Sequence, residues 1–599
     1  MKKKYNWLLT YCKTVKLLFK ISPPYLFFTV VLSLIVGIST PITIYIWKDV
    51  INSIESILKV GDVSIQDIDI LFKIIISYLV VKQANCLAMA LMQYVQNIYN
   101  DYINKDIAEL IFQKILSYRL EIFDDASIYN EIEKANSETA IRSLSILQIL
   151  VNSIQYIAAF IGTAIILLPY SQSVVIGCIV TSIPAFYVGY RIMNKLYEVY
   201  NRRFERNRFI NAIKKILTNS DFMKEIKIFS SGHYLLEKIE KTFKKNIVED
   251  KKIQKKITLE NAAVLCFDDI STILLKGIVI AIGIKNKVMI GTIMMNISAV
   301  DSVKNSLKNL LSVLSTACED CLYMQSFFNI YEQKDRVTEK PDFNEEIYSI
   351  EFIDVSFKYP KTEKNIIDRL NMKFVKGKNY AIVGENGSGK STVIKLLCGL
   401  YFATEGKILI NGQDIKKFNV VSIYSKIGCV FQEFVKYPLS IKENIAISNI
   451  QEKENQALIK EVTKKVGLDQ YIEKLPDKYD TQLKREWTKG IELSGGQWQR
   501  VAVSRCFMKD FNVLIMDEPS ASLDIMAEKQ LYHNLQKLNR NNLSVFVTHR
   551  YIDPDLIDEV IVLDKGRIVQ KGTPKELSLC KGFYSDMLKT YKCDYSGAL

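Results

Sequence analysis

The chain has 599 residues, of which 49% are hydrophobic and 24% are charged, and its formal net charge is +14 at pH 7. This length excludes a single domain, and the apolar fraction is unusual for a wholly soluble protein. The positive charge could indicate nucleic-acid binding, but Lys and Arg are densest at residues 191–256, between apolar runs, and no basic motif interleaved with aromatic residues is present. Such a distribution is typical of cytoplasmic loops, so we expect no nucleic-acid partner.

Six apolar runs, each roughly twenty residues or longer, are long enough to cross a lipid bilayer. The connections between them alternate between short outer loops and long inner segments, whose apolar–polar periodicity predicts helices that extend into the cytoplasm. The first run is too long for a cleaved signal peptide, so we expect it to be retained as a helix. The sequence therefore predicts a multi-pass α-helical domain in the cytoplasmic membrane, with runs near residues 25–47, 69–95, 145–168, 172–192, 260–284 and 289–314.

Several ionisable side chains fall inside these runs, where contact with lipid is costly. Lys82 lies in the second run, Lys276 in the fifth and Asp301 in the sixth, all near mid-depth at about 1.5 Å of rise per residue. We expect these three residues to line a polar, substrate-facing cavity. The alternatives are structural pairs between spans, or shifted boundaries that leave some charges in cytoplasmic extensions. The other charges in the fifth and sixth runs are Asp268, Asp269, Lys304 and Lys308.

A phosphate-binding loop is the most specific motif in the chain. It matches the pattern G-x-x-x-x-G-K-[ST], which arises by chance in about two per cent of chains of this length. A strand-like run at residues 379–383 precedes it, and a helix should begin near Lys390, which is the context that phosphate binding requires. The predicted ATP-binding residues of this loop are Gly384, Glu385, Asn386, Gly387, Ser388, Gly389, Lys390, Ser391 and Thr392.

Two consecutive carboxylates end a second strand-like run, at residues 513–517. Asp517 is placed to hold Mg²⁺ through water, and Glu518 is placed to polarise an attacking water. The Ser391 hydroxyl can ligate the same ion. These features predict an ATP hydrolase that uses ATP and Mg²⁺.

Four shorter motifs accompany the loop and the carboxylates. Gln432 and His549 each follow a strand-like run, and the string Leu-Ser-Gly-Gly-Gln lies about a hundred residues after the phosphate-binding loop. Together and in this order, the six motifs resemble the nucleotide-binding domain of ATP-binding cassette (ABC) proteins, with its P-loop, Q-loop, signature, Walker B motif, D-loop and H-loop. The signature residues are Ser494, Gly495, Gly496 and Gln497, and the D-loop residue is Asp524.

The resemblance implies a role for each motif. Tyr359 would stack on adenine, Gln432 would sense Mg²⁺ and the γ-phosphate, and His549 would contact the γ-phosphate. Each ATP in this family lies between the P-loop of one domain and the signature of another. A chain with one P-loop and one signature should therefore work as a dimer, and a homodimer is the simplest form; a heterodimer is the alternative.

Six spans followed by an ATPase resemble the exporter-type ABC half-transporter, which implies a fold with a polytopic helical domain and an α/β P-loop domain in the cytoplasm. We expect the membrane domain at residues 1–331, a linker at 332–347 and the nucleotide-binding domain at 348–599. By the same resemblance, residues 123–130 and 221–229 should contain short coupling helices that dock near Gln432.

Several local strings resemble the lantibiotic exporters, which export ribosomally made, modified peptides. These strings lie at residues 431–437, 441–445, 480–483 and 493–499, and within the two coupling segments. The predicted cargo is accordingly a peptide, and a multidrug or lipid exporter is the alternative. No N-terminal cysteine protease is expected, since Cys12 has no His before His233. A cargo with a leader peptide would thus need a separate leader protease.

Overall fold

The computed structural model describes residues 7–60, 64–332, 340–518, 542–549 and 553–596. Its chain divides into two compact units, and each is considered by itself. One unit comprises Met1–Leu116 and Asn130–Gln333, and the other comprises Ser117–Tyr129 and Lys334–Leu599. The short segment between the second and third predicted spans thus belongs to the unit that contains the ATPase motifs.

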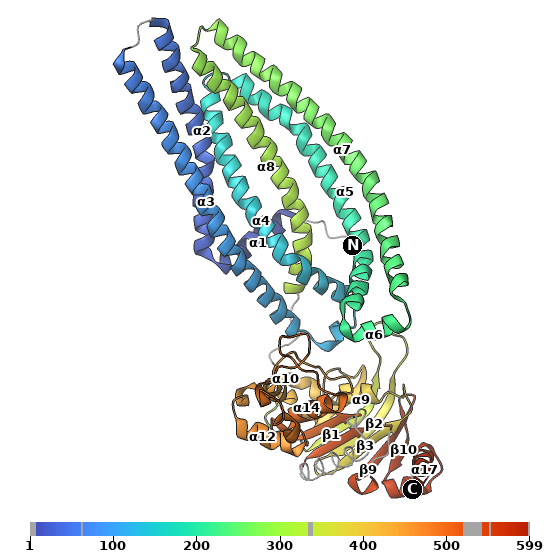
Figure 1. Ribbon diagram of the computed structural model, residues 1–599. Helices are drawn as coiled ribbons and strands as arrows, with labels where there is room; N and C mark the ends of the chain where they lie inside the picture. Colours follow the sequence, from blue (N-terminus) through green and yellow to red (C-terminus); the bar gives the residue numbers. More distant parts are fainter. Residues whose placement is uncertain (1–6, 61–63, 333–339, 519–541, 550–552, 597–599) are drawn as a thin grey trace. The chain divides into compact units, whose positions relative to one another are not determined.

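The first unit is helical (Figure 1). Its long helices coincide with all six runs predicted to cross the bilayer, and several continue far beyond them. An N-terminal helix, α1, precedes the first run and was not predicted; it buries Thr10, Thr14, Leu17 and Leu18. The helices are α1 (Trp7–Ile21), α2 (Pro23–Val60), α3 (Ile65–Leu116), α4 (Ala126–Leu167), α5 (Gln172–Thr218), α6 (Ser220–Ile228), α7 (Gly232–Lys285) and α8 (Ile290–Tyr331).

Within the described residues, four helices are long and apolar enough to cross a membrane by length and composition alone: Pro23–Lys59, Ile65–Leu116, Glu138–Leu167 and Gln172–Ile192. The fifth and sixth predicted spans form α7 and α8, which fall outside that set. The physical reason is their charge, because α7 contains Asp268, Asp269 and Lys276 within the fifth span, and α8 contains Asp301, Lys304 and Lys308 within the sixth.

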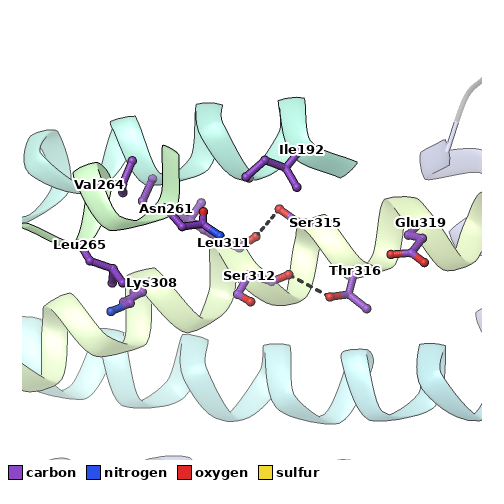
Figure 2. Close-up of a pocket in the computed structure, with 12 residues that line it drawn as sticks. Ile192, Asn261, Val264, Leu265, Lys308, Leu311, Ser312, Ser315, Thr316 and Glu319 are labelled. Atoms are coloured by element: carbon purple, nitrogen blue, oxygen red, sulfur yellow. Dashed lines mark hydrogen bonds between the residues drawn. The ribbon is translucent and has the colours of Figure 1, made fainter. Parts of the chain in front are cut away.

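A hollow of about 410 Å³ lies between α5, α7 and α8. Its wall combines apolar side chains such as Val264 and Leu265 with hydroxyl groups and two opposite charges, Lys308 and Glu319 (Figure 2). The hydroxyls of Ser315 and Thr316 donate to carbonyls one turn earlier in α8. This face of α8 is therefore polar, although it lies on one of the predicted spans and its cytoplasmic extension.

The second unit is an α/β domain with two sheets. A four-stranded antiparallel sheet has the order β2-β1-β4-β5, and a six-stranded sheet has the order β10-β9-β3-β8-β7-β6, in which β3, β6, β7, β8 and β9 are parallel. Its strands are β1 (Ser349–Phe357), β2 (Ile367–Val375), β3 (Asn379–Gly384), β4 (Glu405–Ile410), β5 (Gln413–Asp414), β6 (Ile427–Val430), β7 (Val513–Asp517), β8 (Leu543–Val547), β9 (Glu559–Asp564) and β10 (Arg567–Gly572).

Short helices cover this α/β domain. The α-helices are α9 (Lys390–Leu397), α10 (Val420–Tyr424), α11 (Ile441–Ala446), α12 (Gln456–Lys465), α13 (Asp469–Ile472), α14 (Gly495–Phe507), α16 (Pro574–Leu579) and α17 (Phe583–Ser596). The 3₁₀ turns are η1 (Leu120–Ile122), η2 (Ile415–Lys417), η3 (Ile450–Glu452), η4 (Lys478–Asp480) and η5 (Pro554–Leu556).

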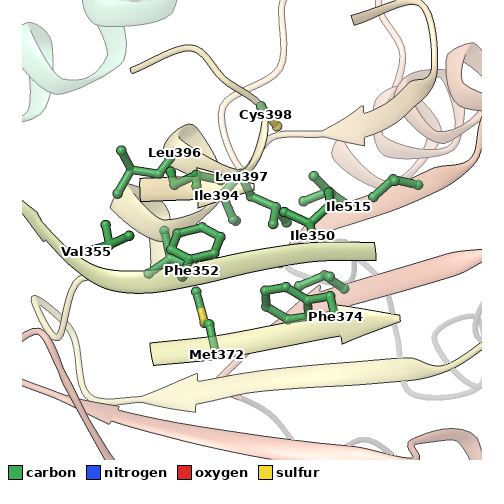
Figure 3. Packing of buried hydrophobic residues seen from close by; sticks show 14 of the residues in the cluster. Ile350, Phe352, Val355, Met372, Phe374, Ile394, Leu396, Leu397, Cys398 and Ile515 are labelled. Atoms are coloured by element: carbon green, nitrogen blue, oxygen red, sulfur yellow. The ribbon is translucent and has the colours of Figure 1, made fainter. Parts of the chain in front are cut away.

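Two hydrophobic cores hold the functional loops of this domain in place. One core packs Phe352 and Phe374 of the antiparallel sheet against Ile394 of α9 and Ile515 of β7 (Figure 3). The other core lies around the fully buried Trp498 of α14. Since α9 begins at Lys390 of the phosphate-binding loop and α14 begins at Gly495 of the signature, each motif is anchored by a helix with a buried apolar face.

Candidate functional site

The phosphate-binding loop lies between β3 and α9, as the sequence predicts. Gly387 and Gly389 adopt φ angles of +83° and +105°, in the left-handed region that side chains disfavour. A Cβ atom on Gly389 would also lie 2.8 Å from the Cδ1 of Ile367. These glycines allow the loop to close tightly before the N-terminus of α9, where backbone N–H groups favour an anion.

Lys390 is nearly buried at the start of α9. Its ammonium group donates to the carbonyl oxygens of Gly384 and Glu385, both at 2.8 Å, so the side chain folds back over its own loop. Burial lowers the pKa of Lys390, and the carboxylates of Glu518 and Asp517 partly oppose that shift. Among the described residues, the buried Ser388 hydroxyl oxygen has no hydrogen-bond partner. A polyphosphate supplies oxygens for both groups, so the loop fits such a ligand.

Asp517 is the last residue of β7. In the sheet, only β8 separates β7 from β3, the strand that precedes the phosphate-binding loop. Asp517 is 6% exposed. Burial, reinforced by the adjacent Glu518, raises the pKa of Asp517 to about 6. A cation beside it would reverse this effect, and carboxylate and hydroxyl oxygens are the ligands that Mg²⁺ prefers.

Three predicted catalytic residues meet around the Glu518 carboxylate. Gln432 donates from Nε2 to Oε2 of Glu518 at 2.8 Å, and Nδ1 of His549 lies 2.7 Å from Oε1. Glu518 has a φ of +48°, and its N–H donates to the carbonyl of Val547 at 2.9 Å. The three side chains come from the carboxyl ends of β6, β7 and β8, the edge of a parallel sheet at which ligands bind.

The predicted adenine platform, Tyr359, follows β1 and is half-buried. Its hydroxyl group lies 3.2 Å from the Oγ1 of Thr392 and accepts from Lys395 at 3.3 Å. The ring packs edge-to-face against Phe357 and Tyr401, with centroids 5.1 and 5.5 Å away. Tyr359 is therefore connected to α9, and so to the loop that precedes that helix.

The signature residues form the N-terminus of α14. Ser494 and Gln497 make a capping box, in which Ser494 Oγ accepts from the Gln497 N–H at 3.3 Å and Gln497 Oε1 accepts from the Ser494 N–H at 2.8 Å. Among the described hydrogen bonds, none joins the signature to the phosphate-binding loop. The predicted D-loop residue, Asp524, lies outside the described residues.

The charged residues predicted to line a membrane cavity lie in different places. Lys276 of α7 and Asp301 of α8 form an ion pair at 2.6 Å, with 30% and 44% of their side chains exposed. Lys82 of α3 is exposed and lies 5.7 Å from the ring centroid of Tyr78. None of the three lines the described hollow between α5, α7 and α8. Sequence reasoning noted Lys308, which does line it, only as a charge within the sixth span.

A second pair lies deeper in the helical unit. Lys304 is 3% exposed and donates to Asp268 at 2.6 Å, to Ser271 at 2.8 Å and to Thr181 at 2.9 Å. All three ammonium hydrogens thus have an acceptor, and the acceptors belong to two helices, α5 and α7. The neighbouring side chains are apolar, among them Val300 and Val303. This cluster joins α5, α7 and α8.

The first predicted coupling segment, residues 123–130, lies in the ATPase unit up to Tyr129, together with the preceding residues 117–122. Glu121, Asp124 and Asp125 accept from the Phe402 N–H, the Tyr401 hydroxyl and the Lys361 ammonium, at 3.3, 2.7 and 2.6 Å. The expected contact near Gln432 is not among these; the three carboxylates instead bind donors beside the adenine platform. Burial, with the Asp124 carboxylate, raises the pKa of Tyr401 well above its usual range. The second predicted segment forms α6 in the helical unit.

Comparison with known proteins agrees with this arrangement. The family model described as ABC transporter matches residues 367–521. The subtilin transport ATP-binding protein SpaT of Bacillus subtilis is 30% identical over 581 residues, 96% of this chain and 93% of that protein. The nisin transport ATP-binding protein NisT of Lactococcus lactis subsp. lactis is 27% identical over 589 residues, 97% and 96% of the two chains.

A solved structure of a bacterial Atm1-family ABC exporter with ATP bound superposes with a TM-score of 0.79 at 21% identity, covering 94% of this chain and 97% of that chain. This likeness shows that the fold is that of an ABC exporter. Since the P-loop, the paired carboxylates and their partners meet at one sheet edge, and since the subtilin transport protein matches nearly end to end, the chain belongs to the ABC transporter family and hydrolyses ATP to drive transport.

Proposed function

We propose that this transporter exports a modified antimicrobial peptide of the lantibiotic class across the cytoplasmic membrane. The single observation that supports this cargo is the near-full-length similarity to the subtilin and nisin transport proteins. The chain is a multi-pass membrane protein with its ATPase domain on the cytoplasmic side, so export starts from the compartment in which ATP is hydrolysed. We assign residues 1–331 to the membrane domain, 332–347 to a linker and 348–599 to the nucleotide-binding domain.

We assign the chemistry of the ATP site residue by residue. The P-loop backbone and Lys390 hold the phosphates, and Tyr359 stacks on adenine. Ser391, Gln432 and Asp517 are the ligands that would hold Mg²⁺, directly or through water, and the ion would neutralise phosphate charge when bound. These groups supply the hard oxygen donors that this ion requires.

Glu518 is the proposed general base. Its carboxylate accepts a proton from the attacking water, and Gln432 and His549, at 2.8 and 2.7 Å, hold the carboxylate in place. His549 would then turn toward the γ-phosphate, to which the family resemblance assigns it. The unusual backbone angle of Glu518 points the carboxylate out from the end of β7.

A homodimer is the proposed working form. The chain contains one P-loop and one signature, and the capping box already presents the Ser494 hydroxyl at the N-terminus of α14. A second copy would bring its own signature to the ATP held by the first P-loop. The peptide cargo would then be handled by two equivalent membrane domains.

For the cargo we propose a path along the polar side of α8. Lys308, Glu319 and the intervening hydroxyls line the hollow, and Lys276 and Asp301 form a half-exposed pair on the facing surfaces of α7 and α8. A peptide presents many polar groups, so such a lining suits it better than an apolar one. A cargo with a leader peptide would be cut by a separate protease.

The test is ATP hydrolysis by the full-length protein in lipid nanodiscs, with three sets of compounds. Lanthionine-bridged peptides should stimulate hydrolysis, and linear peptides of the same composition should stimulate it less. Stimulation by hydrophobic drugs or by lipids, with no response to any peptide, would contradict the proposal and favour a multidrug or lipid exporter. Mass spectrometry of ligand retained on the purified protein provides an independent identification.

A further inference from the structure

We infer that Tyr401 is a positioning residue that links the segment 117–129 to the ring of Tyr359. The inference rests on the proposed adenine-stacking role of Tyr359 and names the side chain through which that ring is held. Segment 117–129 follows α3 and includes the first residues of α4, and both are membrane-spanning helices. A displacement of those helices would therefore be transmitted to Tyr359 through a few contacting side chains.

The first link is the attachment of the segment to the ATPase unit. Its three acidic residues each accept from a different partner, and one of these partners, Lys361, lies two residues after Tyr359. The Arg119 guanidinium adds a stacking contact, 4.4 Å from the ring centroid of Phe402. Four contacts over seven residues hold this segment against the strip 359–402, so the segment and the strip should move together.

The second link is the aromatic cluster. Tyr401 is 2% exposed, and its ring contacts Phe357 and Tyr359 edge-to-face at 5.5 Å in both cases. The ammonium group of Lys395 of α9 lies over both tyrosine rings, 5.3 Å from the Tyr359 centroid and 5.6 Å from the Tyr401 centroid. Edge-to-face contacts depend strongly on ring orientation, so the orientation of Tyr401 restricts that of Tyr359.

The hydroxyl group of Tyr401 sets that orientation, because it donates to Asp124 Oδ2 at 2.7 Å across 277 residues of sequence. Tyr401 is too buried to contact the nucleotide itself, so its effect must pass through Tyr359. When the hydrogen bond is intact, the platform is held ready for a base. When the segment withdraws, the Tyr401 ring is free to turn and the platform loses its support.

Tyr401→Phe tests the link because it removes the hydroxyl and keeps the ring. We expect the KM for ATP of the full-length protein in nanodiscs to rise about threefold to tenfold, the range of one hydrogen bond, with kcat nearly unchanged. The KM for UTP should change less, because a pyrimidine gains less from stacking on Tyr359. Asp124→Ala should match Tyr401→Phe, and the double variant should add nothing further.

Three controls separate positioning from folding. Asp124→Asn keeps an acceptor oxygen and should restore most of the ATP affinity. Tyr479→Phe removes another part-buried tyrosine hydroxyl, 2.9 Å from Thr463 Oγ1, and should leave the KM for ATP unchanged. Lys390→Ala reports on the ATP site itself: if that variant hydrolyses ATP normally, the proposed site is wrong, whatever Tyr401 does.

Two results would overturn the inference while the ATP site stands. One is an unchanged KM for ATP in Tyr401→Phe, with or without a lower melting temperature, which would make the hydroxyl a packing group. The other is an equal rise of KM for ATP and UTP, which would place its effect on the phosphates and not on the base.

Discussion

At the residue scale, Glu518 offers one carboxylate oxygen to each of two partners, Gln432 and His549. Both partners come from neighbouring strands, so the carboxylate is oriented before any water arrives. Glutamine has the same shape but cannot accept a proton at neutral pH. The group that activates water can therefore be removed without changing the packing around it.

We predict that Glu518→Gln lowers kcat for ATP hydrolysis by about 10²- to 10⁴-fold, the usual contribution of a general base, and leaves ATP binding intact. Phosphate release and nucleotide binding, measured on the same preparation, check the two halves of this prediction. Glu486→Gln, a change at an exposed carboxylate in the same domain, is the matched control and should be neutral. Near-normal turnover in Glu518→Gln would show that another residue activates the water.

Asp517 gives a pH-dependent prediction. Its pKa rises from 3.8 to about 6 on folding, because burial and Glu518 disfavour the charged form. The folded protein thus binds more protons than the unfolded chain between these values, and this contribution to stability is full below pH 3.8 and is lost as pH rises through 6. Any Mg²⁺ bound beside Asp517 would favour the charged form instead.

We expect the melting temperature of the nucleotide-free protein to fall more steeply between pH 4 and 6 in the wild type than in Asp517→Asn, which lacks the titrating group. Scanning fluorimetry measures both profiles. Their difference removes the contribution of the other carboxylates, which the two proteins share. Asp510→Asn removes an exposed acid nearby in sequence and should leave the profile unchanged. Parallel profiles for wild type and Asp517→Asn would contradict the assigned burial effect.

At the scale of elements, two ion pairs connect α7 and α8, and they differ in burial. Lys304 and Asp268 are 3% and 17% exposed, whereas Lys276 and Asp301 are 30% and 44% exposed. Breaking a buried pair leaves an uncompensated charge among apolar side chains, whereas a half-exposed partner can still be solvated. The first pair should therefore stabilise the helix packing, and the second is free to contact cargo.

We predict that Lys304→Met destabilises the helical unit by about 3–5 kcal/mol, as for other broken buried pairs. The double variant Lys304→Met/Asp268→Leu should recover part of this loss, because no charge is left unpaired. Lys276→Met should leave thermal stability nearly unchanged and reduce peptide-stimulated ATP hydrolysis. Melting of the protein in detergent, followed by size-exclusion chromatography, measures the stability differences.

The contrary outcome is a similar loss of stability for Lys276→Met and Lys304→Met. Lys276 and Asp301 would then form a structural pair, which is the alternative that the sequence left open. Unchanged stability with unchanged cargo stimulation would place the cargo path away from this pair.

At the scale of the whole molecule, one chain contains a single P-loop and a single signature. If each ATP lies between the P-loop of one copy and the signature of the other, defects in the two motifs should complement each other. A mixed dimer of Lys390→Ala and Ser494→Arg chains would have one site with both defects and one site with none. Each variant alone would have a defect in both sites.

We therefore expect that co-expressing the Lys390→Ala and Ser494→Arg chains with different affinity tags restores ATP hydrolysis in the doubly purified complex. The level should reach at most about half of the wild-type rate, since one of two sites is intact. Mixing wild-type and Lys390→Ala chains provides the control for assembly. Full activity in a monomer would contradict the homodimer. So would a chain that forms a stable complex only with a different ABC chain.

Much of this protein could be predicted from the sequence alone. The P-loop, the Asp517–Glu518 pair and the strand-end positions of Gln432 and His549 are local, because a strand, a turn and a helix N-terminus each depend on a few consecutive residues. All six long apolar runs lie within helices, because a run of about twenty apolar residues has the length that a helix needs to cross a bilayer. The nearly full-length similarity to the subtilin transport protein confirms the family that the motifs indicated.

Other features depended on the tertiary structure, because they join residues far apart in the sequence. The rotation of α7 against α8 decides that Lys304 is buried on Asp268 while Lys276 meets Asp301, and a one-dimensional pattern contains no such rotation. The same holds for the hydrogen bond from Tyr401 to Asp124, which no local spacing predicts. Sequence therefore determined which chemical groups the protein contains and on which elements they lie; packing determined which of those groups meet.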